Sequence, residues 1–95
     1  MLTNLMLMKF KDRSPENVEA AKELLLSMRG QIEYLADISI KTDTRHGNSS
    51  YDFAMIAKYN SEEDFNAYAA HPLHVEVGKK VIAMTEDIAT VFYED

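Results

Sequence analysis

Residues 65–77, FNAYAAHPLHVEV, contain the clearest local signal in this chain. Proline has no backbone N–H and disfavours a helical conformation in the residue before it, so a helix running into His71 is expected to end there. Pro72 also suits the first position of a following helix. The sequence therefore predicts a corner between two helices that holds Tyr68, His71 and His74. Because these side chains donate and accept hydrogen bonds and histidine titrates near neutral pH, the corner is the first candidate functional site.

The two helices that precede this corner have serine caps. Ser14 stands before Pro15 and Glu16, an order typical of an N-cap, a first helical position and an acidic first turn. Apolar residues then recur at helical spacing, and Gly30 is expected to end this helix. Ser61 and the three acidic residues after it predict the start of the helix that ends at the corner.

Short apolar segments elsewhere in the chain predict strands. Their lengths are below those of typical helices, and their side chains divide into two faces. The predicted strands are residues 2–10, 34–41, 51–59 and 88–93. The turn-rich residues 42–50 predict an exposed loop between the second and third strands. The resulting order predicts an α+β domain with a ferredoxin-like βαββαβ fold and an antiparallel sheet.

The first and third strands are apolar on both of their faces. The two helices of a ferredoxin-like fold can cover only one face of such a sheet. An uncovered apolar face needs a partner, and a second copy of the chain is the simplest one. The pattern therefore predicts a homodimer.

Composition limits the classes of function. The 95 residues are expected to form one domain, residues 1–95. The chain has no cysteine, which excludes disulfides and thiolate metal sites and fits a cytoplasmic location. A net charge of −6 without a basic cluster argues against nucleic-acid binding. No apolar run reaches the roughly 20 residues of a membrane span, and no secretory signal is expected.

Each polar residue near the corner has a structural and a functional interpretation. His74 could act as an acid, a base or a ligand partner beside Asn4 and Tyr68, or it could bind backbone groups at the helix break. His71 is expected to cap the preceding helix. The two histidines supply only half of a tetrahedral shell, so no metal is expected. No glycine-rich phosphate loop is present, and no cofactor is expected.

Two further patterns concern the strands. Asp52 and Lys58 would lie on one strand face, which predicts an ion pair at the rim of the sheet. Met6, Met8 and Met55 would form an apolar surface. This methionine surface could belong to the core, to a dimer interface or to a pocket for an apolar ligand.

The chain resembles the stress-responsive A/B barrel domain (Dabb) family of the dimeric α+β barrel superfamily. The resemblance rests on residues 5–12, 51–54 and 87–93, and above all on the Tyr-x-x-His-Pro-x-His element of residues 68–74. It implies a ferredoxin-like protomer whose sheet packs face to face with that of a second protomer. Most members of the family have no assigned reaction.

One branch of the family contains a plant polyketide cyclase. The resemblance implies that the tyrosine and last histidine of the element, here Tyr68 and His74, would act together in a cavity. The family often has a histidine where this chain has Asn4. The cyclase's other pocket histidine and tyrosine align with Phe53 and Leu26. These differences argue against cyclase chemistry.

Two functional hypotheses follow. The first is a homodimeric Dabb-like protein that binds a small apolar or aromatic molecule, or serves as a structural module, with a ligand site at Asn4, Phe53, Tyr68, His71 and His74. The alternative is a cofactor-independent enzyme, similar to a polyketide cyclase, an isomerase or a monooxygenase. In that case Tyr68 and His74 would be the catalytic residues.

Overall fold

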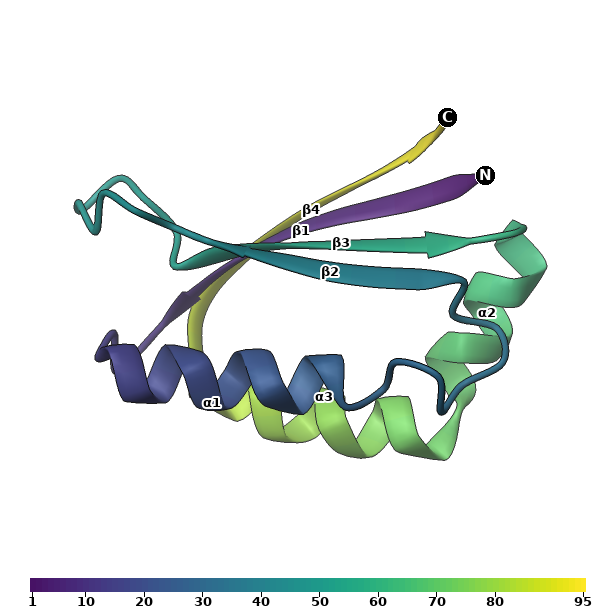
Figure 1. Ribbon diagram of the computed structural model, residues 1–95, viewed down its shortest axis with the longest axis horizontal. Coiled ribbons are helices and arrows are strands. Elements are labelled where there is room, and N and C mark those ends of the chain that lie inside the picture. The colour runs from purple at the N-terminus through teal and green to yellow at the C-terminus, as the bar shows by residue number, and fades with distance from the viewer.

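The computed structural model describes residues 1–95 as a four-stranded sheet with three helices on one face (Figure 1). The elements are β1 (Leu2–Phe10), α1 (Pro15–Leu26), β2 (Asp37–Thr42), β3 (Phe53–Tyr59), α2 (Glu62–Ala70), α3 (Pro72–Met84) and β4 (Thr85–Glu94). The strand order is β2-β3-β1-β4, and every neighbouring pair is antiparallel. This is the ferredoxin-like arrangement, so the predicted fold class is confirmed.

The helix starts follow the capping signals. The Ser14 hydroxyl accepts a hydrogen bond from the backbone N–H of Asn17 at 3.3 Å, and α1 begins at Pro15. The Ser61 hydroxyl accepts one from the N–H of Asp64 at 3.1 Å. Each cap satisfies one of the backbone N–H groups that a helix leaves without an internal partner. Both predicted helix starts are confirmed.

The ends of several elements differ from the predictions. Helix α1 ends at Leu26, and Gly30, with a φ of +75°, lies in the turns that follow it. Strand β2 begins at Asp37, because Leu35 is held in a turn by its N–H to the carbonyl of Ile32. Strand β3 begins at Phe53, two residues later than predicted. Strand β4 begins at Thr85, directly after α3.

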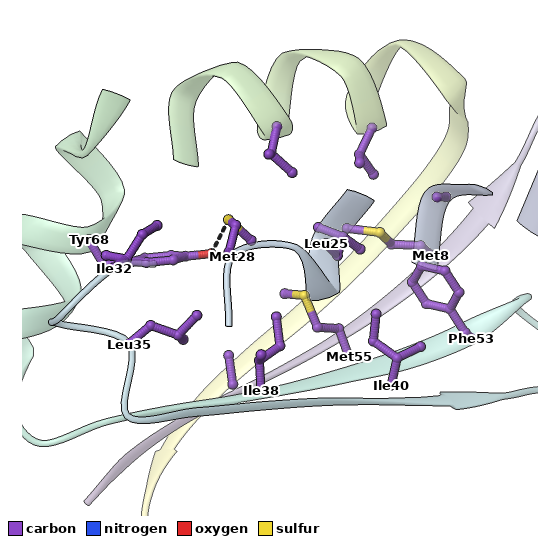
Figure 2. Close-up of a cluster of buried hydrophobic side chains, with 14 of the residues drawn as sticks. Met8, Leu25, Met28, Ile32, Leu35, Ile38, Ile40, Phe53, Met55 and Tyr68 are labelled. Carbon is purple, nitrogen blue, oxygen red and sulfur yellow. Dashed lines mark hydrogen bonds between the residues drawn. The ribbon is translucent and has the colours of Figure 1, made fainter. Parts of the chain in front are cut away.

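The hydrophobic core lies between the sheet and the helices. Figure 2 shows side chains from the strands, including Met55, Ile38 and Ile40, rising toward Leu25 and Met28. Helices α1 and α3 contact each other and lie side by side beneath the sheet (Figure 1). None of the three helices has the length and apolar character needed to cross a membrane. The helices therefore cover one face of the sheet and leave the other face without a helix.

The second face of the sheet has no helix over it. The register of β1 with its neighbours places one row of mainly apolar residues there. We call this row the open face; it consists of Leu5, Leu7, Ala54, Ile56, Ala89 and Val91. Val91 is 50% exposed, and the others are only half-buried. The prediction that β1 and β3 are apolar on both faces is thus confirmed.

Asp52 does not pair with Lys58, so the predicted rim pair is wrong. The Asp52 carboxylate is buried, contacts Arg13 Nε at 2.9 Å and accepts the backbone N–H of Phe10 at 2.8 Å. Lys58 pairs with Asp95 at 2.9 Å instead. The reason is that Asp52 precedes β3, so it is outside the alternation on which the prediction depended.

Candidate functional site

A mainly apolar cavity lies between the sheet and α3. Its volume is about 280 Å³, and 13 of its 17 lining residues are hydrophobic, so it suits an apolar occupant. Met6, Met8 and Met55 line it from the sheet, while Val77, Gly78 and Val81 line it from α3. The hydrophobic residues include Tyr59 and Tyr68, whose hydroxyls are polar, and the other polar side chains are Asn4, His74 and Thr90. No Asp, Glu, Lys or Arg lines the cavity.

The His71–Pro72 corner places the polar side chains. His71 has φ −65° and ψ 134°, an extended conformation that ends α2, and its backbone N–H donates to the carbonyl of Tyr68 at 3.0 Å. The ring of His71 turns to the next helix, where Nδ1 accepts the N–H of Leu73 at 3.1 Å. His71 therefore caps the end of α2 through its backbone, as predicted, and its ring also caps the start of α3.

His74 satisfies the end of α2 and also borders the cavity. Its Nδ1 lies 3.0 Å from the carbonyl oxygen of Ala69. A carbonyl only accepts, so Nδ1 carries the hydrogen, and Nε2 of the neutral ring is an acceptor. Nε2 has no partner in the protein. The same side chain thus fits the structural interpretation and keeps one ring nitrogen without a protein partner.

Tyr68 lies against His74, with 4.3 Å between the ring centroids. Its side chain is 3% exposed, and its hydroxyl donates a weak hydrogen bond to Met28 Sδ at 3.9 Å (Figure 2). Burial raises the pKa of the Tyr68 hydroxyl above its ordinary value. Burial also raises the pKa of neighbouring Tyr59. Both phenols are therefore neutral at physiological pH and can donate a hydrogen bond.

Asn4 connects β1 to β4 at the side of the cavity. Its amide nitrogen donates to Thr90 Oγ1 at 2.7 Å and to the carbonyl of Val91 at 3.2 Å. The atom of the Asn4 amide that faces the Val91 carbonyl must be the nitrogen, because a carbonyl oxygen accepts hydrogen bonds and only the amide nitrogen can donate one. The amide oxygen Oδ1 has no protein partner. Since no fully buried side-chain oxygen in this structure lacks a partner, Oδ1 is accessible.

Comparison with known proteins assigns the family. The model of the Dabb family, the stress responsive A/B barrel domain, matches residues 2–95. The chain belongs to the Dabb family. A matching relative, the stress-response A/B barrel domain-containing protein DABB1 of Arabidopsis thaliana, is 44% identical over 43 residues, which are 45% of this chain. The match spans only 20% of that protein's length.

Solved structures share the Dabb fold of this chain. A dimeric ferredoxin-like protein of unknown function from Thermobifida fusca is 25% identical, with a TM-score of 0.85, over 99% of this chain and 90% of that one. Hydroxynitrile lyase from Passiflora edulis also has a TM-score of 0.85, over 97% of this chain and 90% of the lyase. Its identity is 14%, so this likeness concerns the fold alone.

The structure brings together three of the five side chains predicted for the Dabb ligand site. Asn4, Tyr68 and His74 line the cavity. His71 does not line it, because its ring is turned to the backbone of α3. Phe53 does not line it either, because it packs in the core against Phe10, with ring centroids 5.2 Å apart. Phe53 lies at the far end of the sheet from Asn4, as the β1–β3 register shows.

Several lining residues were missing from the sequence prediction. Thr90 and Phe92 reach the cavity from β4, and Gly78 reaches it from α3. The alternation of residues 88–93 could have placed Ile88, Thr90 and Phe92 on one face. It could not have shown that this face borders a cavity, because that depends on how α3 packs over the sheet.

Metal binding has no structural support at the corner. No three His, Asp or Glu side chains are placed to hold a metal ion. Nδ1 of His71 and Nδ1 of His74 both bind backbone groups. The His-x-x-His spacing is therefore accounted for by the two helix ends that it stabilises.

Proposed function

We propose that this Dabb protein is a homodimer that binds one small apolar or aromatic molecule in the cavity of each protomer. The cavity between the sheet and α3 is the observation that carries this proposal. An apolar cavity of about 150 Å³ can hold benzene. The cavity here has a volume of about 280 Å³ and therefore accommodates a substituted single ring.

The lining favours an uncharged ligand. A charged group that enters such a cavity loses its hydration and gains no counter-ion, because no charged side chain lines the wall. Aromatic rings from Tyr59, Phe65, Tyr68 and Phe92 border the cavity. These rings can contact an aromatic ligand edge to face, an arrangement that adds to the benefit of burial.

The homodimer is supported by the open face. Its side chains form a mainly apolar surface that no helix of the same chain covers, and such surfaces are typical of protein contacts. Lysines and aspartates border it at both ends, for example Lys9 with Asp87 and Lys58 with Asp95. A two-fold axis can place opposite charges of two such borders together. The Thermobifida fusca relative is described as dimeric, which agrees with a second copy as the occupant.

Thermal denaturation with a panel of small aromatic compounds tests the ligand proposal. A compound that binds only the folded protein raises its melting temperature in proportion to the logarithm of its concentration once the site is nearly saturated. Gly78→Leu should abolish this increase, because the larger side chain occupies the cavity. Ala83→Leu, on the exposed side of the same helix, is the matched control and should preserve it. If no compound in the panel stabilises the wild type, the ligand proposal is wrong.

A cofactor-independent enzyme is a second candidate, favoured by the free Nε2 of His74. A neutral imidazole nitrogen beside an apolar cavity is suited to accept a proton from a bound substrate. Tyr68, as a neutral phenol, could donate a hydrogen bond to the oxygen where charge develops. Compounds that stabilise the wild type should then be converted to product, and His74→Asn should stop the conversion without preventing binding. Binding without any conversion would leave the first function in place and exclude this one for those compounds.

A cytoplasmic location is part of the proposal, because a chain without cysteine fits a reducing compartment. The net charge of −6 offers no basic surface for nucleic acid. Fractionation of cells that produce the protein tests the location. Recovery in a membrane or secreted fraction would contradict it.

A further inference from the structure

A second hollow lies on the surface outside the cavity, where the first half of α2 faces the end of β4 and the start of β1. We call it the outer groove, and its volume is about 480 Å³. Leu2, Phe65, Phe92 and Tyr93 supply its apolar part. Glu62 and Glu94 are its only charged side chains, and both residues are exposed. The outer groove therefore combines an apolar surface with two carboxylates that water can reach.

Two phenylalanines separate the outer groove from the inner cavity. Phe65 and Phe92 line both spaces, and their rings meet edge to face with centroids 5.0 Å apart. Phe92 is still 43% exposed. Because covering an exposed aromatic ring removes apolar area from water, a partner that lies over this pair gains free energy.

A homodimer through the open face leaves the outer groove uncovered. Leu2 and Glu94 pair in the β1–β4 register, three positions from the pair Leu5 and Val91. Since side chains alternate along a strand, an odd number of positions places the two pairs on opposite faces of the sheet. The outer groove therefore lies on the helix side, away from the proposed dimer contact.

Several elements meet at the end of the molecule that holds the outer groove, on the right in Figure 1. Strands β1 and β2 begin there, β3 and β4 end there, and α2 starts there. Glu33 and Asp64 both raise the pKa of the Tyr34 hydroxyl, so the loop before β2 also belongs to this end. Seven of the 16 acidic residues of the chain lie here: Glu33, Asp37, Glu62, Glu63, Asp64, Glu94 and Asp95.

Few basic groups balance these carboxylates. Only two of the 10 lysines and arginines lie at this end. Lys58 pairs with Asp95 at 2.9 Å, and Arg29 donates to the carbonyl of Ile38. The amino group of Met1 contacts Glu94 at 3.4 Å. Most of the net charge of −6 is therefore concentrated around the outer groove, where it attracts cations.

We propose that the outer groove binds a basic amphipathic segment of a partner protein. Apolar side chains of the segment lie against Phe65 and Phe92, and its lysines or arginines lie opposite Glu62 and Glu94. Charge complementarity identifies the partner, because a cationic segment is attracted to this acidic end and oriented by it. This binding is separate from the proposed function, which concerns a small ligand in the inner cavity.

Other occupants fit the outer groove less well. A nucleic acid or an anionic membrane is repelled by the same carboxylates. A metal ion lacks a coordination shell, because no three His, Asp or Glu side chains are placed to hold one. A small organic cation gains the charge contacts but covers little of a groove of about 480 Å³.

Two synthetic peptides of equal charge test the proposal: KKLLKK and KKAAKK, amidated and labelled with the same fluorophore. Their affinities for the full chain are measured by fluorescence anisotropy. KKLLKK should bind about tenfold more tightly, because its leucines bury more apolar area in the groove. Its affinity should fall severalfold between roughly 50 mM and 300 mM salt, since exposed charge pairs are screened.

Two matched variants remove the same charge from different places. Glu62→Gln/Glu94→Gln neutralises the outer groove, and Glu19→Gln/Glu23→Gln neutralises two exposed carboxylates of α1. The groove variant should weaken the binding of KKLLKK by about fivefold, whereas the α1 variant should change it by less than about twofold. In NMR spectra of the wild type, the peptide should shift the amide signals of residues 62–66 and 92–94.

Each contrary outcome overturns the proposal. If KKLLKK does not bind the wild type, the groove has no basic partner. Equal affinity of the two peptides, or an equal loss in the two variants, would mean attraction by net charge without a contribution from the groove. Amide shifts confined to the open face would place the peptide on the dimer surface. A wild-type mass above that of a dimer in light scattering, lost in Glu62→Gln/Glu94→Gln, would make a further copy of this chain the occupant.

Discussion

Replacing Gly78 by alanine should make the protein more stable and its cavity smaller. Gly78 lies in the middle of α3 and lines the cavity. A Cβ atom added there has no heavy atom within 4 Å, so the methyl group meets no steric obstacle. Glycine costs about 0.8–1.0 kcal/mol relative to alanine in a helix interior. The expected gain in the free energy of unfolding is therefore about 1 kcal/mol.

Urea denaturation followed by circular dichroism measures this gain. For a chain of this size, about 1 kcal/mol corresponds to a melting temperature higher by roughly 4–8 °C. Ala20→Gly is the reciprocal control, because Ala20 is exposed in the middle of α1. It should lower the free energy of unfolding by a similar amount. The two variants together separate helix propensity from any effect of the cavity.

The same substitution should weaken ligand binding, since the methyl group takes part of a volume of about 280 Å³. The variant would then be more stable and less able to bind, which is a common cost of stabilising a binding site. A loss of stability in Gly78→Ala would refute the reasoning, because it would mean that the space beside α3 is already filled. Higher stability with unchanged affinity would place the ligand elsewhere.

Three further predictions concern other parts of the molecule. Asp52→Ala should lower the free energy of unfolding by about 3 kcal/mol in urea titrations, because it leaves the Phe10 N–H and Arg13 without their buried partner; a loss below about 1 kcal/mol would contradict this. The backbone N–H of His46 donates a hydrogen bond to the Asp43 carboxylate and lowers its pKa. The charged Asp43 carboxylate therefore stabilises the fold above its unfolded pKa, and this stabilisation is lost as the pH falls through the lower pKa of the folded state. The melting-temperature difference between wild type and Asp43→Asn should therefore be constant near neutral pH and shrink below about pH 4; a difference that grows on acidification would show the opposite sign. Val91→Lys on the open face should give a monomer mass in light scattering where the wild type gives a dimer, and a monomeric wild type would disprove the dimer.

Local sequence signals accounted for the order of the elements. Serine caps, the proline at the corner and the two-residue alternation of the strands act over a few residues, so they can be recognised without knowledge of the fold. They were sufficient to predict the ferredoxin-like topology and the two-sided strands. They were less accurate at strand ends. The N–H of Leu35 binds the carbonyl of Ile32 in a turn, so β2 begins at Asp37, later than predicted.

The candidate site was only partly predictable for the same reason. The Tyr68 and His74 pair was visible because both residues belong to one short element, residues 68–74. Phe53 was assigned by alignment, whereas its packing against Phe10 depends on the pairing of β1 with β3. Asp52 was paired within its own strand, whereas its partner Arg13 is 39 residues away in the sequence. Such long-range partners leave no local pattern.

Sequence information was thus enough for the elements, their order and the corner that holds the histidines, because capping, proline stereochemistry and side-chain periodicity are local effects. Tertiary packing alone determined the cavity and the partners of the polar side chains that line it. The free Nε2 of His74 depends on Ala69 across the corner, and the free Oδ1 of Asn4 depends on Thr90, 86 residues away. Hydrogen-bond donors are assigned to partners only when the chain is folded, so local sequence patterns could not show which polar atoms stay unpaired.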